Sequence, residues 1–178
     1  MSSSSSHERR WQCVRLAVCV VALVLWMGFI FFMSANDGDH SQGMSDGLTS
    51  FVLSAVWPGF SDMSPDEQTA VVGSLSFFVR KAGHFSEYAV LGLLALATLR
   101  QGQALRSSQA LRNTRKIAPV AVGAVAMAFV YACFDEFHQL FVAGRSGQPF
   151  DVGVDTAGAL VAVAIVLAVM RMRERHRV

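Results

Sequence analysis

Four long apolar segments restrict what this chain can fold into more than any other feature of its sequence. The predicted membrane spans are residues 16–34, 81–99, 117–137 and 152–170. A helix needs roughly 20 apolar residues to cross the hydrocarbon core of a bilayer, and each segment is close to that length. Hydrophobic residues make up 53% of the chain and charged residues only 16%, which is unlike a soluble domain. The sequence therefore predicts an all-α, integral membrane four-helix bundle.

The basic residues predict how the four spans are oriented. All but three of the 15 Lys and Arg residues fall in the N-terminal arm, the loop after the second span and the C-terminal tail. These residues are Arg9, Arg10, Arg15, Arg100, Arg106, Arg112, Arg115, Lys116, Arg171, Arg173, Arg175 and Arg177. Because cations gather on the cytoplasmic side of membrane proteins, both termini are expected in the cytoplasm. The three exceptions, Arg80, Lys81 and Arg145, are expected on the external side.

The segments outside the spans are predicted from their composition and from helix-capping signals. The expected parts are a disordered basic arm, a four-span domain and a basic cytoplasmic tail, at residues 1–15, 16–170 and 171–178. Residues 34–47 are rich in Ser, Asp and Gly and are expected to form an external loop. The apolar residues 51–60 are expected at the membrane interface. A helix is then predicted to start at Ser64, where Glu67 closes a capping box, and to turn at Gly73 before the second span.

Polar residues gather at the external ends of the last three spans. Their spacing of three and four residues places them on one face of each helix. The three stripes are Arg80, His84 and Glu87, then Asp135, His138 and Gln139, then Asp151 and Asp155. Ionisable groups are costly in hydrocarbon, so these faces should meet in the bundle interior or in a wet cavity. The spacing thus predicts an outward-facing polar pocket, to which Arg145 adds a cation from the loop before the last span.

Two blocks of these residues resemble the VanZ-like family of bacterial membrane proteins. The blocks are RKAGHFSEYAVLGLL and DEFHQLFVAGRSGQPFDVGVDTAGAL, and the exit from the first span, FMSAND, is also similar. The resemblance covers most of residues 25–170, with Ala143 where the family usually has Pro. It implies a multi-pass protein of the bacterial cytoplasmic membrane with a function in the cell envelope. The family is named after a member linked to low-level teicoplanin resistance, and no agreed catalytic activity comes with the name.

The sequence leaves three interpretations of the polar pocket open. In the first, the pocket binds an anionic or amphiphilic ligand, such as a lipid-linked cell-wall precursor or a lipoglycopeptide, through Arg80, Lys81, Tyr88, Gln139, Arg145, Asp151 and Asp155. In the second, acid–base groups catalyse hydrolysis or transfer on a lipid-linked phosphate, the candidates being His84, Glu87, Asp135, Glu136 and His138. In the third, the protein is a non-catalytic partner or permease with structural ion pairs, joining Arg80 or Arg145 to Asp151 or Asp155, and His138 to Glu87.

The same residues bear on cofactors and partners. Histidine and carboxylate side chains suit a divalent metal, but the three external cations would repel one, so no metal and no other cofactor is predicted. The net charge of +2 indicates no nucleic-acid partner, and membrane lipid is the expected one. The cysteines, Cys13, Cys19 and Cys133, lie in or beside apolar segments and are predicted to be reduced packing residues.

Overall fold

The computed structural model describes residues 2–106 and 117–176. In these residues the chain forms helices and no strands, and the helices are α1 (Ser2–Ser34), α2 (Gly38–Val56), α3 (Pro65–Arg106), α4 (Ile117–Gln139) and α5 (Pro149–Arg175). Helices α1, α3, α4 and α5 are long and apolar enough to cross a membrane. This confirms the predicted all-α class and the four apolar helices.

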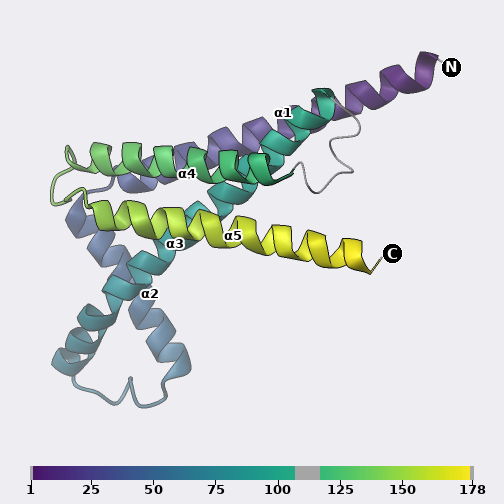
Figure 1. The fold of residues 1–178 in the computed structure, drawn as a ribbon. Coiled ribbons are helices and arrows are strands. Elements are labelled where there is room, and N and C mark those ends of the chain that lie inside the picture. Colours follow the sequence, from purple (N-terminus) through teal and green to yellow (C-terminus); the bar gives the residue numbers. More distant parts are fainter. Residues whose placement is uncertain (1, 107–116, 177–178) are drawn as a thin grey trace.

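The four apolar helices pack around small residues and a few large ones (Figure 1). Tyr88 and Leu91 of α3 are fully buried against alanines of α4 and α5. The largest helix contact joins α3 to α5, and two glycines allow their backbones to approach closely. A Cβ atom on Gly92 would lie 2.9 Å from the Cα of Ala159, and one on Gly158 would run into the carbonyl oxygen of Phe85. Such small-residue contacts are how membrane helices associate where lipid is as apolar as the side chains.

One end of the bundle brings together segments that are far apart in the sequence. The last turns of α1 and α4 and the first turns of α2 and α5 lie at this end, whereas the chain termini lie at the other (Figure 1). The Gly38 N–H donates to the Ala143 carbonyl oxygen over 3.0 Å, which ties the start of α2 to the loop after α4. The polar stripes of α4 and α5 are in the last turns of α4 and the first turns of α5, and the stripe of α3 lies midway along that helix. We call this end of the bundle the polar end.

Helix α2 corrects the expectation that residues 34–47 form a loop. Asp37 is the N-cap residue of α2, and its carboxylate accepts a hydrogen bond of 2.7 Å from the His40 N–H. The Ser, Asp and Gly residues that suggest a loop therefore start a helix instead. The helix is held by burial of Ser45, Thr49 and Leu53 against α3, a tertiary contact that overrides the low helix propensity of its glycines.

The expected turn at Gly73 is also wrong, because α3 is continuous from Pro65 to Arg106. Its start agrees with the predicted capping box. The Ser64 N–H donates to Glu67 Oε2 over 2.9 Å, and the Glu67 N–H donates to Ser64 Oγ over 3.4 Å. A single glycine costs a helix about 1 kcal/mol, which is too little by itself to interrupt a long helix.

The ends of the other spans extend beyond their predicted bounds. Helix α1 begins at Ser2, so residues expected as part of a disordered arm continue the first span as helix. Residues 2–27 contain no Pro or Gly that would stop the helix there. Helix α5 likewise continues into the expected basic tail and ends at Arg175. Three cations of the loop after the second span lie outside the described residues, namely Arg112, Arg115 and Lys116.

Candidate functional site

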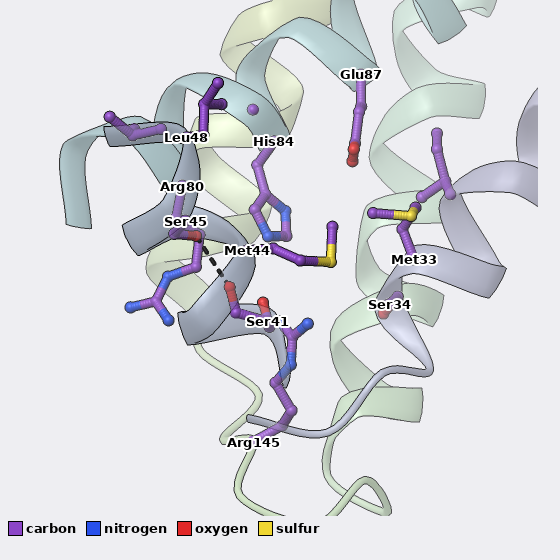
Figure 2. A pocket seen from close by; sticks show the side chains of 13 residues that line it. Met33, Ser34, Ser41, Met44, Ser45, Leu48, Arg80, His84, Glu87 and Arg145 are labelled. Atoms are coloured by element: carbon purple, nitrogen blue, oxygen red, sulfur yellow. Dashed lines mark hydrogen bonds between the residues drawn. The ribbon is translucent and has the colours of Figure 1, made fainter. Parts of the chain in front are cut away.

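A pocket of about 200 Å³ lies at the polar end between α1, α2 and α3 (Figure 2). Its lining residues are Ile30, Met33, Ser34, Ser41, Met44, Ser45, Leu48, Val79, Arg80, Gly83, His84, Glu87 and Arg145. Four of the predicted site residues are therefore brought together here: Arg80, His84, Glu87 and Arg145. Figure 2 shows Arg145 entering from the loop side, while Glu87 points in from the opposite end of the pocket.

The two arginines of the pocket donate hydrogen bonds to uncharged groups. Arg80 Nη1 donates to Gln42 Oε1 over 3.2 Å, and Arg145 Nε donates to the backbone oxygen of Asn36 over 3.2 Å. In the described part of the chain, neither guanidinium takes part in an ion pair. Burial lowers the pKa of Arg145 from its ordinary value, and the positive charge of Arg80 lowers it further. The pocket therefore carries two cations that repel each other and that, among the described residues, have no carboxylate within ion-pair distance.

His84 lies between the pocket and a buried acid of α5. Its Nδ1 atom is 3.5 Å from Oδ1 of Asp155, a residue with no exposed surface. This distance is at the limit of a hydrogen bond, and neither carboxylate oxygen has another hydrogen-bond partner among the described residues. The imidazole thus joins a buried negative charge to the cavity, the arrangement in which a carboxylate orients a histidine and stabilises its protonated form.

Lys81 and Asp151 form an ion pair outside the pocket lining. Their side chains are largely buried, at 14% and 10% exposure, and the ammonium group contacts Asp151 Oδ1. The Lys81 Nζ atom also lies 5.2 Å and 5.8 Å from the ring centres of Phe77 and Phe150. Both charges are satisfied by one another and by these rings, so this pair joins α3 to α5 and leaves neither group free for a ligand.

The polar residues of α4 lie around the pocket without lining it. Asp135 is buried and accepts a hydrogen bond of 3.4 Å from Gln139, which also donates to Ser34 Oγ over 3.0 Å. Glu136 Oε2 accepts from the Gln148 N–H over 2.7 Å and so holds the start of α5. The ring of His138 stacks on that of Phe31, with the ring centres 4.5 Å apart.

Tyr88 is likewise a core residue, with no exposed surface. Its ring centre is 6.3 Å from that of Tyr131, and its hydroxyl has no hydrogen-bond partner among the described residues. Tyr88 is therefore not positioned to contact a ligand in the pocket.

The third interpretation of the polar pocket expected structural ion pairs, and the described residues form different ones. In the chain as far as it is described, the side-chain ion pairs are Lys81–Asp151 and His84–Asp155. Neither Arg80 nor Arg145 meets an aspartate, because both turn toward α2 and the α1–α2 loop instead. Within the same residues, no group of three or more His, Cys, Asp or Glu side chains could hold a metal ion.

The side of the pocket that α2 forms was not predicted from the sequence. Ser41, Met44 and Ser45 come from the segment expected to be a loop, and Leu48 follows that segment directly. A signal was present, because Ser41, Ser45 and Thr49 repeat every four residues and so share one helical face. The Thr49 hydroxyl donates to the Ser45 carbonyl oxygen over 2.7 Å, which satisfies it within the helix.

Comparison with known proteins agrees with this architecture. The model of the VanZ/LLP1 family matches residues 19–171, a stretch that begins about midway along α1 and includes all of the polar end. No curated protein and no solved structure matches the chain. Because the match covers far more than half of the sequence and includes both polar blocks, this chain belongs to the VanZ/LLP1 family.

Proposed function

We propose that this protein binds an anionic or amphiphilic ligand of the cell envelope, with Arg80 and Arg145 holding the negative group. The observation that carries the proposal is that two partly buried guanidinium groups line one pocket, and neither forms an ion pair with a carboxylate in the part of the chain that the structure describes. Burying such charges is costly unless an opposite charge meets them. Guanidinium groups also match phosphate and carboxylate oxygens better than other cations do, through paired hydrogen bonds.

Binding of inorganic phosphate by the purified full-length chain in a nonionic detergent tests this proposal. At about 100 times the dissociation constant, a ligand specific for the folded state stabilises it by about 2.7 kcal/mol. We expect phosphate to raise the unfolding temperature above that in chloride of equal ionic strength. The Arg145→Gln variant is expected to lose this increase, because one of the two charge-assisted contacts is removed.

The matched control for that experiment is Arg100→Gln. Arg100 is on α3, toward the end of the helix that lies away from the pocket, and it donates to the Met170 sulfur over 3.3 Å. This variant should keep the full response to phosphate. An equal response in wild type and Arg145→Gln would show that phosphate acts elsewhere, and the proposal would fail.

The pocket is expected to face the outside of a bacterial cytoplasmic membrane, with both termini in the cytoplasm. The separation of the chain termini from the polar end supports this orientation (Figure 1), together with the basic residues near the termini. In a background without native cysteines, a membrane-impermeant maleimide should label Ser61→Cys in intact cells. His176→Cys should be labelled only after permeabilisation, and the reverse pattern would invert the orientation.

A cell-envelope ligand would connect the protein to glycopeptide susceptibility. If the pocket takes part of a lipid-linked cell-wall precursor or a lipoglycopeptide, cells that express the protein should be less susceptible to teicoplanin. Arg145→Gln should remove the difference while the protein remains in the membrane. An unchanged inhibitory concentration in both strains would separate ligand binding from any role in resistance.

Hydrolysis or transfer on a lipid-linked phosphate is the second candidate function, and His84 is the residue that favours it. The imidazole lines the pocket and has a buried carboxylate behind it at 3.5 Å, which is the geometry of a general acid–base group. Phosphate release from a short-chain prenyl pyrophosphate would support this function if His84→Gln abolished the release and kept the binding. Absence of release from the wild-type protein would leave ligand binding alone.

A further inference from the structure

The end of the pocket that is expected to face water lies beside hydrogen-bonded loops, and apolar side chains border the pocket on one side. At the water-facing end, the α1–α2 loop is tied to the α4–α5 loop by the Gly38–Ala143 and Arg145–Asn36 hydrogen bonds. Beside it, α2 packs against α3 and has little contact with α1. The pocket is lined from both of these helices, with Met33 of α1 facing Met44 of α2 (Figure 2). Because α1 and α2 have little contact here, we place the opening of the pocket between Met33 and Met44 and call it the side opening.

An apolar stripe leads away from the side opening along α2. Met44, Leu48 and Phe51 follow spacings of four and three residues, so they share one helical face. All three are exposed, and Phe51 is 72% exposed. The opposite face of α2 is polar and buried, with Ser45, Thr49 and the Gln42–Ser76 hydrogen bond turned toward α3. A helix with its polar face inward and its apolar face outward is suited to lipid rather than water.

The size of the pocket limits which part of a ligand it can enclose. Sites that bury a whole drug-sized molecule have volumes of about 300–1,000 Å³, and this one has about 200 Å³. A small anionic group fits, whereas the remainder of an amphiphile or a whole glycopeptide does not. The remainder has to leave by the side opening, where the surroundings are apolar.

On the basis of the proposed function, we infer that the ligand is a membrane lipid with a small phosphate headgroup, which enters from the bilayer through the side opening. The phosphate lies beside Arg80 and Arg145, and the hydrocarbon chain passes between α1 and α2 along Met44, Leu48 and Phe51. Glu87 lies at the end of the pocket opposite Arg145, away from the phosphate (Figure 2). The combination of paired cations with an apolar exit matches both parts of such a lipid.

Photo-cross-linking in vesicles tests this inference on the full-length chain. Phe51 is replaced by benzoylphenylalanine, and the protein is placed in phosphatidylcholine vesicles that contain phosphatidic acid as the minor lipid. We expect the Phe51 adducts to be enriched in phosphatidic acid about tenfold over the vesicle composition, equivalent to about 1.4 kcal/mol of preference. The matched control is the same replacement at Phe134, which is 57% exposed on α4 and outside the pocket lining; its adducts should follow the vesicle composition.

A second set of variants identifies what causes any enrichment. Arg80→Gln with Arg145→Gln should return the Phe51 adducts to the vesicle composition, and persistent enrichment would overturn the inference. In the wild type, the Phe51 adducts could follow the vesicle composition while inorganic phosphate still stabilises the protein. That result would overturn the lipid route and leave anion binding intact. If phosphate also has no effect, the proposed function fails together with this inference.

Discussion

Replacing Lys81 with methionine is expected to lower the free energy of unfolding by about 3–5 kcal/mol, the usual cost of removing one member of a buried ion pair. The Lys81 ammonium contacts the Asp151 carboxylate, and little of either side chain is exposed. Methionine keeps the apolar stem between Phe77 and Phe150, so the main loss is the positive charge. Unfolding of the purified protein by increasing SDS in mixed micelles measures the change.

The double variant Lys81→Met with Asp151→Leu separates the ion pair from the packing around it. Replacing a whole buried pair by apolar residues is often neutral, so the double variant should unfold near the wild-type midpoint. A solvated surface ion pair contributes less than about 1 kcal/mol, so Lys81→Met alone would then lower the free energy of unfolding by no more than that. That result would contradict the idea that this pair holds α3 to α5.

The second large effect is expected from Gly158→Ala on α5. A Cβ atom there would run into the backbone carbonyl oxygen of Phe85, so α3 and α5 must separate. Overpacking of this kind costs about 1–3 kcal/mol, and we expect the upper value because a backbone atom cannot rotate away. The clash is next to His84, and Asp155 is one turn from Gly158. The same variant is therefore expected to weaken phosphate binding in the pocket.

Gly153→Ala is the control for Gly158→Ala, since both are on α5 and gain the same methyl group. Nothing lies within 4 Å of a Cβ atom at Gly153. This variant should be neutral or more stable by up to about 1 kcal/mol, because alanine favours a helix more than glycine does. Equal stability of the two alanine variants, measured by SDS unfolding, would show that the α3–α5 contact is looser than described.

Features encoded by nearby residues were predictable from the sequence. Apolar length alone predicted the four helices that can cross a membrane, because the bilayer requires about 20 apolar residues whatever their neighbours are. The capping box at Ser64 and Glu67 was equally local. The 4 and 3 spacing of Arg80, His84 and Glu87 placed them on one face, and all three line the pocket.

Helix α2 was not predictable in the same way. Asp37 and Gly38 are as common in turns as at the start of a helix, and local composition does not separate the two. The outcome depends on burial of Ser45, Thr49 and Leu53 against α3, which is a contact between distant segments. With α2 missing from the prediction, the apolar border of the pocket at Met44 and Leu48 was missing as well.

The sequence by itself determined that this chain forms four apolar helices and that its ionisable residues gather near one end of three of them. Only the tertiary structure decided which of those residues meet. Arg80 and Lys81 are neighbours, but they point about 100° apart around α3, so Lys81 reaches Asp151 on α5 while Arg80 faces Gln42 on α2. Helical periodicity fixes the direction of a side chain on its own helix, whereas the helix found in that direction depends on packing contacts such as Gly158 against Phe85.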